Sequence, residues 1–287
     1  GYAAARRMEE SNAWRNPIDL IELLHAAYAQ IPTALAEGQR QRGDWQGRQR
    51  VVEAVIGEDP RAITQALLEA LRTGASEVEL ASAVAYAAAL RIARFHTSNE
   101  FGDWDTALHT FTFANAVHQG LRRLAGHSSP DEYLLLLRGV FDAAMSVYLD
   151  RFLNIPAARL PQPASTNGHN GSLRHLESLL DQQQQVNQAG NAVGEFLFAK
   201  GDAAALRAEL ASLLLREDRD FHTIQSVEAA FRQHDLLMAQ PETQNEAVYV
   251  LVAAARYLAA HAPTVRAQDQ TFGIARRLHR NEKLFEG

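Results

Sequence analysis

The stretch that decides the fold class reads Ser76-Glu77-Val78-Glu79-Leu80-Ala81-Ser82-Ala83-Val84-Ala85-Tyr86-Ala87-Ala88-Ala89-Leu90-Arg91. Ser76 and Glu79 form a capping box, in which each side chain hydrogen-bonds a backbone N–H at the start of a helix. Alanine and leucine, which favour helices most strongly, fill the positions that follow. Leu80 and Val84 lie on one face at helical spacing. The stretch predicts a long helix from about residue 76 towards residue 96.

Comparable helix-start signals recur along the chain. Asp59 precedes Pro60, and Ser129-Pro130-Asp131-Glu132 combines an N-cap residue, a proline at the first helical position and acids in the first turn. The alternation that is typical of β-strands is scarcely found. We therefore predict an all-α, multi-helix bundle, with helices near residues 17–30, 60–74, 76–96, 130–154, 173–199, 202–215, 221–238, 243–261 and 265–280.

The helical pattern is interrupted between residues 156 and 172. This segment holds three of the nine prolines together with several Asn and Gly residues, a composition that favours a loop or linker. It separates an N-terminal helical half, 8–155, from a C-terminal half, 173–287, and we expect the two to pack as one domain. Asp59 and Asp202 precede similar Ala- and Leu-rich helices. Two hypotheses explain this likeness: a duplicated helical unit, or a coincidence of composition.

Composition excludes several classes of function. The 287 residues include 28 Lys and Arg against 34 Asp and Glu, for a net charge of −6, which argues against a nucleic-acid-binding protein. No apolar run approaches the roughly 20 residues of a membrane span. There is no cysteine, so any metal would have His, Asp or Glu ligands. Nucleotide-binding and serine-hydrolase motifs are also missing. We expect a cytoplasmic protein that binds neither nucleic acid nor membrane.

The densest run of polar and aromatic residues is 94–119, and it carries the first hypothesis about chemistry. His96 and Glu100 are four residues apart, as are Asp105 and His109, so each pair shares one helix face. Gly102 indicates a break between two helices, which could bring the pairs together as ligands of an iron or manganese carboxylate site. The structural alternative is that Asp105 or the nearby Asp103 caps the second helix and that each His is a hydrogen-bonded core residue.

Three further positions could converge on this segment. His25 lies in an apolar stretch, His222 lies near a predicted helix start, and Asp142 lies among apolar neighbours. Arg138 precedes Asp142 by four residues, which gives that acid a structural role as well. For His25, His222 and Asp142, a purely structural role is the alternative to a role in a metal site. The predicted metal ligands are His25, His96, Glu100, His109 and His222, and the predicted cofactor is iron or another divalent metal.

Two segments carry a resemblance to a known group of proteins. The residues from Phe95 through Phe113 and from Tyr148 through Pro156 resemble a bacterial helical domain associated with Rieske-type [2Fe-2S] proteins. A Rieske cluster needs two Cys and two His ligands, so this chain departs from the cluster-binding module itself. The resemblance implies an accessory or catalytic helical domain that works beside a Rieske-type partner protein or domain.

Two functions follow as expectations. The first is a metal-dependent oxidoreductase, in which a non-haem iron held by His and carboxylate side chains receives electrons from a Rieske-type partner. The second is a non-catalytic helical binding module that takes a partner or a small ligand.

Overall fold

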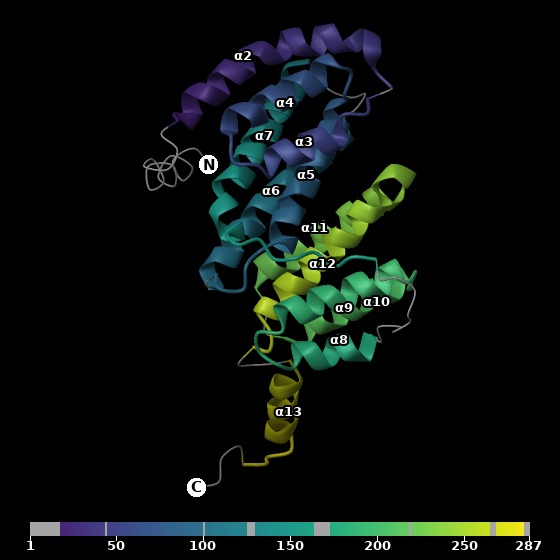
Figure 1. The fold of residues 1–287 in the computed structure, drawn as a ribbon. Helices are drawn as coiled ribbons and strands as arrows, with labels where there is room; N and C mark the ends of the chain where they lie inside the picture. Colours follow the sequence, from purple (N-terminus) through teal and green to yellow (C-terminus); the bar gives the residue numbers. More distant parts are fainter. Residues whose placement is uncertain are drawn as a thin grey trace. The chain divides into compact units, whose positions relative to one another are not determined.

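A computed structural model describes residues 18–43, 45–99, 101–124, 130–163, 173–217, 220–264 and 268–283. These residues form twelve α-helices and three short 3-10 helices, and they contain no strand (Figure 1). The predicted all-α fold is confirmed. No helix in the described ranges is both long and apolar enough to cross a membrane. The chain divides between Ala157 and Ala158 into two compact units, which we call unit 1 and unit 2 and describe separately.

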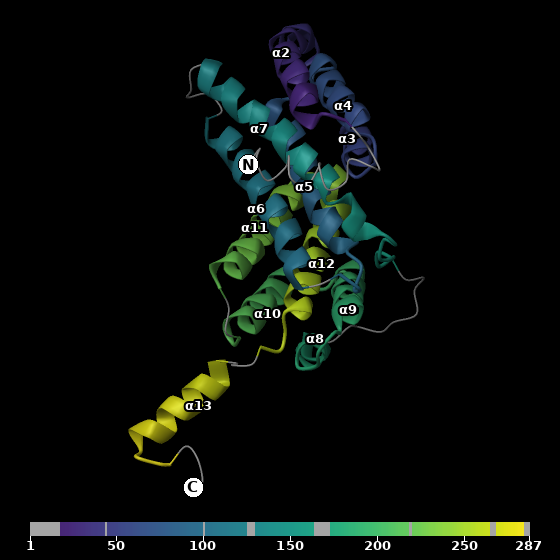
Figure 2. The same ribbon diagram turned by 90° about the vertical axis from the view of Figure 1, so that its left-hand side faces the viewer.

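Unit 1 is organised around one buried, alanine-rich helix, α5. Its neighbours in the unit are α3, α6 and α7, while α2 packs on α4 (Figures 1 and 2). A short 3-10 helix, Arg151–Asn154, follows α7. The helices of this unit are α2 (Leu20–Gly38), α3 (Arg48–Val55), α4 (Pro60–Arg72), α5 (Glu77–Ala93), α6 (Phe101–Leu124) and α7 (Pro130–Leu149).

The predicted capping box begins α5. The Ser76 hydroxyl accepts from the Glu79 N–H at 3.2 Å, and the Glu79 carboxylate accepts from the Ser76 N–H at 2.8 Å. Nearly every residue of α5 is buried, which explains why it is apolar all round rather than on one stripe. Alanine side chains let the neighbouring helices approach closely, so the sequence that starts the helix locally also places it at the centre of the unit.

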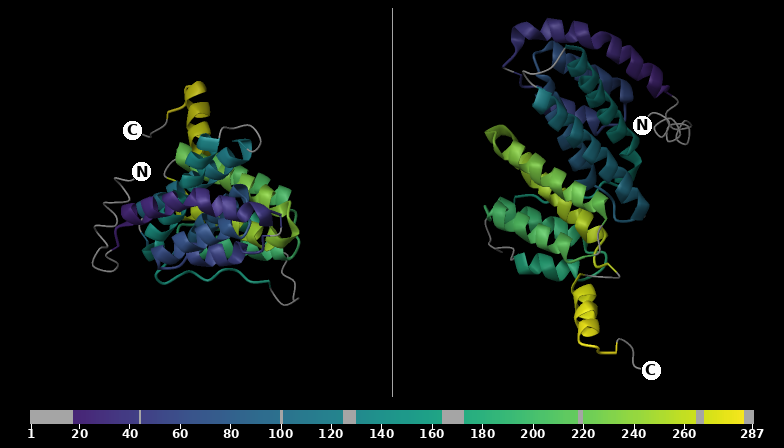
Figure 3. Two further views of the ribbon diagram at one scale, coloured as in Figure 1. Left: turned by 90° about the horizontal axis from the view of Figure 1, so that it is seen from above. Right: turned by 180° about the vertical axis from the view of Figure 1, so that it is seen from behind.

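Unit 2 is arranged around a second alanine-rich helix, α12, which packs against α9 and α11 (Figure 3). Gly190 of α9 makes room for this packing, because a Cβ there would lie 2.8 Å from Cγ of Arg256 on α12. The helices of this unit are α8 (Leu173–Leu180), α9 (Val186–Phe198), α10 (Ala203–Leu215), α11 (Phe221–Met238), α12 (Gln244–Ala260) and α13 (Gln268–His279), with a 3-10 helix at Pro241–Thr243.

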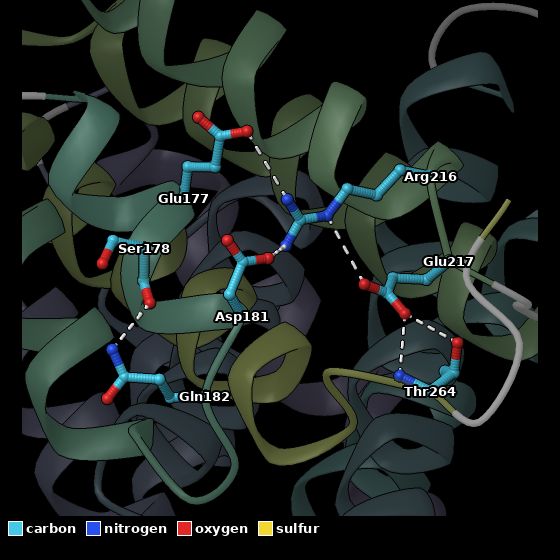
Figure 4. A network of polar contacts seen from close by, with 7 residues as sticks. All are labelled: Glu177, Ser178, Asp181, Gln182, Arg216, Glu217 and Thr264. Carbon is cyan, nitrogen blue, oxygen red and sulfur yellow. Dashed lines mark hydrogen bonds and ion pairs between the residues drawn. The ribbon is translucent and has the colours of Figure 1, made fainter. Parts of the chain in front are cut away.

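A polar network ties the ends of three elements of unit 2 together (Figure 4). Arg216, at the end of α10, pairs with Asp181 after α8 at 2.7 Å and with Glu177 of α8 at 3.6 Å. Its neighbour Glu217 is buried and accepts hydrogen bonds from the backbone N–H and hydroxyl of Thr264 at 2.7 and 2.6 Å. The buried carboxylate therefore holds the segment after α12 against the end of α10.

Several helix boundaries differ from the sequence-based prediction. The predicted start of α2 lies outside the described residues. The helix is capped by Asp19 and continues through Pro32 to Gly38, beyond the predicted end at residue 30. The short helix α3 was not predicted. The single helix predicted for 173–199 is broken between α8 and α9, where Gln184 has a φ of 63°. A left-handed residue does not fit a continuous helix, and the exposed glutamine tract provides no apolar face to continue one.

The prediction that Gly102 separates two helices was wrong in its position. Helix α6 already begins at Phe101, so Gly102 and Asp103 lie in its first turn, and neither Asp103 nor Asp105 precedes the helix as an N-cap. The break falls earlier, after α5 ends at Ala93.

Candidate functional site

The predicted centre around His96 and His109 is only partly within the described residues. The His96 ring lies before α6, with Nδ1 2.6 Å from the Ser98 hydroxyl and 3.2 Å from the Ser98 N–H. His109 is exposed on α6, and Glu100 lies outside the described residues. Within the described ranges, no group of three or more His, Asp or Glu side chains could hold a metal ion. Because Glu100 is not described, the iron site stays a prediction.

The other two predicted ligands belong to different units. His25 is exposed on α2 in unit 1. His222 is half-buried in the first turn of α11 in unit 2, and its ring lies 3.8 Å from the ring of Phe221, measured between centroids. His222 therefore has an aromatic neighbour within its own helix.

Unit 1 does bring His25 together with two further side chains that the sequence singled out, Arg138 and Asp142. They line a pocket of about 530 Å³ between α2 and α7. The lining residues have i, i+3 and i+4 spacing on α2 and i, i+3 and i+7 spacing on α7, so each helix contributes one face. The lining residues of this α2–α7 pocket are His25, Tyr28, Ala29, Leu135, Arg138 and Asp142.

Tyr28 organises the polar side of the α2–α7 pocket. Its hydroxyl donates a hydrogen bond to Oδ1 of Asp142, across 114 residues of sequence. Its ring meets Phe141 edge-on, with centroids 6.3 Å apart. The guanidinium carbon of Arg138 lies 5.6 Å from the centre of the Tyr28 ring, within the range of a cation–π interaction. Tyr28 thus ties α2 to α7 and positions the cation of the pocket.

A second polar cluster is buried where α5 and α7 end. Arg91 donates to Oδ1 of Asn154 at 2.9 Å, and the Asn154 amide donates back to the Arg91 carbonyl at 3.0 Å. Asp150 is buried beside them and hydrogen-bonded to Thr110. Burial raises the pKa of Asp150 to about 7 and lowers the pKa of Arg91 to about 10, although each charge favours the other. The cluster joins the two segments that carried the family resemblance.

Sequence reasoning missed Tyr28 and Asp150 as members of polar clusters. Tyr28 follows His25 by three residues, so the sequence indicates that the two share one helix face. The sequence does not indicate which residue of α7 Tyr28 contacts. A buried arginine in each unit, Arg91 and Arg256, was missed as well. Arg256 donates to Asn187 Oδ1 at 2.7 Å and has its pKa lowered to about 10 by burial.

Comparison with known proteins adds no assignment to this geometry. No family model, no curated protein and no solved structure matches the chain. The resemblance to a domain associated with Rieske-type proteins therefore stays an expectation from the sequence.

Proposed function

We propose that unit 1 is a binding module that takes a small organic carboxylate in the α2–α7 pocket. The observation that carries the proposal is the Arg138 guanidinium, held over the Tyr28 ring at the wall of a pocket that also contains His25. The oxidoreductase hypothesis depends on Glu100, which is not described, whereas this proposal depends on residues that the structure describes.

The polar groups of the pocket offer a carboxylate ligand a cationic partner. Arg138 is a permanent cation, and its planar fork matches a carboxylate. Asp142 is the acidic residue of the lining, and its Oδ1 already accepts from the Tyr28 hydroxyl. The contact with Tyr28 also limits the side-chain freedom that Arg138 would lose when a ligand binds, so less of the binding free energy is spent on ordering it.

The size and the apolar walls indicate a ligand with a hydrocarbon part. A volume of about 530 Å³ lies within the usual range for small-molecule sites. Ala29 and Leu135 supply apolar surface, and Leu135 is largely exposed without a ligand. A carboxylate on an aromatic or short aliphatic group would place its charge on Arg138 and its carbon atoms against Leu135.

The proposal is tested by titration calorimetry with benzoate and hexanoate as probes and with benzamide as the neutral counterpart of benzoate. The carboxylates should bind, and benzamide should bind at least about tenfold more weakly, a difference of about 1.4 kcal/mol. Arg138→Gln should weaken carboxylate binding by a similar factor. Arg123→Gln, which removes an exposed arginine from α6 in the same unit, should leave it unchanged.

Two results would contradict the proposal. One is that neither carboxylate binds at concentrations up to about 10 mM, about tenfold above a millimolar affinity. The other is that Arg138→Gln and Arg123→Gln bind benzoate equally well.

A further inference from the structure

Helix α13 of unit 2 exposes a cluster of large apolar side chains. Phe272 is 67% exposed, Ile274 46% and Leu278 54%. Leaving such side chains in water forgoes the free energy that burying their apolar surface would release. Several large apolar residues gathered on one short helix indicate an interaction surface.

Basic residues border this apolar face on both sides. With 3.6 residues per turn, Ile274, Leu278 and Phe272 fall within one half of the helix circumference. Arg276 follows Phe272 by four residues and Arg277 follows Ile274 by three, so one arginine lies next to each edge of the apolar face. Both arginines are exposed. Arg277 also pairs with Glu282 at 3.7 Å.

The charge of this segment is opposite to that of the whole chain. Arg276, Arg277, Arg280 and Lys283 stand against Glu282 at the end of α13, whereas the chain carries a net charge of −6. A basic face beside an apolar face complements the surface of a membrane that contains anionic lipids. There the apolar side chains enter the headgroup region, and the long arginine side chains reach the phosphates.

A second copy of the chain fits this face less well. In a symmetric dimer formed through the apolar face, each patch meets the same patch of the other copy. Arg276 and Arg277 at the edges would then meet the same arginines of the second copy, and like charges repel.

We propose that α13 docks on the surface of membranes that contain anionic lipids, lying parallel to the surface rather than crossing it. The helix contributes Phe272, Ile274 and Leu278 as apolar contacts, and Arg276 and Arg277 as contacts to lipid phosphate. This inference does not depend on ligand binding in unit 1, and it replaces the expectation from composition that the chain binds no membrane.

Vesicle flotation of the full chain tests the proposal, with phosphatidylcholine vesicles prepared with and without phosphatidylglycerol. The protein should float only with the anionic vesicles, and added salt should release it, because salt screens the attraction. Phe272→Ser combined with Leu278→Ser should abolish binding. The matched control is Phe221→Ser with Ile224→Ser, which removes side chains that are 62% and 47% exposed on α11, and it should bind as the wild type does.

The arginines provide a second test that preserves the apolar face. A basic residue near an anionic surface contributes about a factor of five to the partition coefficient, so Arg276→Gln with Arg277→Gln should lower it about 25-fold. The inference is wrong if the wild type does not float with anionic vesicles, or if the Phe272 and Leu278 variant floats equally well. It is also wrong if those substitutions convert a dimer to a monomer in size-exclusion chromatography without any vesicle binding.

Discussion

Replacing Asp150 with asparagine should change how the stability of unit 1 depends on pH. The carboxyl group is buried, and burial raises its pKa from 3.8 to about 7, while the Thr110 hydrogen bond and the charge of Arg91 oppose this effect. Asparagine has nearly the same shape and can still accept from Thr110, but it is never charged. The variant therefore isolates the free-energy cost of ionising a carboxyl group inside the core.

The size of the effect follows from the difference between the two pKa values. Between pH 3.8 and about 7, the folded protein holds a proton on Asp150 that the unfolded chain has released. The stabilisation is fully present below pH 3.8, where both states are protonated, and it is lost as the pH rises through the folded pKa. One pKa unit corresponds to 1.36 kcal/mol. Wild type should thus lose about 2.5 kcal/mol relative to Asp150→Asn between about pH 5 and about pH 8.

Urea unfolding followed by tryptophan fluorescence measures this difference in unit 1 alone. All three tryptophans, at positions 14, 45 and 104, precede the boundary after Ala157, and Trp104 is buried in the core. Asp59→Asn is the control, because the exposed Asp59 caps α4 and asparagine caps helices equally well. Its difference from wild type should be the same at both pH values. If the Asp150→Asn difference is equally constant, Asp150 is ionised throughout this range, and attraction to Arg91 outweighs the cost of burial.

Two further predictions concern unit 2. Gly190→Ala should destabilise it by about 1–3 kcal/mol, because the new Cβ would lie 2.8 Å from Cγ of Arg256. Hydrogen exchange in α9 and α12 should then become at least about fivefold faster, whereas Gly273→Ala, which meets no atom within 4 Å, should not accelerate it. Glu217→Ala should cost on the order of 3 kcal/mol, because it removes the buried charged acceptor of two hydrogen bonds from Thr264. Thermal unfolding with no loss of stability would show that Glu217 is dispensable.

Helix boundaries were predictable where the signal is local. The capping box of Ser76 and Glu79 and the N-cap Asp59 each involve residues two to three positions apart, so the sequence contains both partners within one turn. Prediction failed where a boundary depends on non-local packing or on an unusual backbone conformation. Pro32 lies inside α2 although proline disfavours helix interiors, and Gln184 adopts a left-handed conformation that favours glycine.

The candidate site was predictable only in its separate parts. The sequence indicated His25 and Asp142 as polar residues among apolar neighbours and Arg138 as a partner for Asp142, but not the tyrosine that connects them. The Tyr28–Asp142 hydrogen bond spans 114 residues, and the Arg91–Asn154 hydrogen bond spans 63. Such pairs depend on which helix faces meet and in what register, and these are settled by the packing of whole helices rather than by neighbours in the chain.

The sequence by itself determined that this protein is all-α and where most of its helices begin, because capping and helical periodicity act over three or four residues. Only the tertiary structure decided which polar residues share a site. The tertiary structure also decided which acidic residue has a shifted pKa. Asp150 and Asp59 are the same residue type, but the packing of α5, α6 and α7 removes water from Asp150, whereas Asp59 is exposed. The free energy of a charge depends on that surrounding water, which only the packed fold determines.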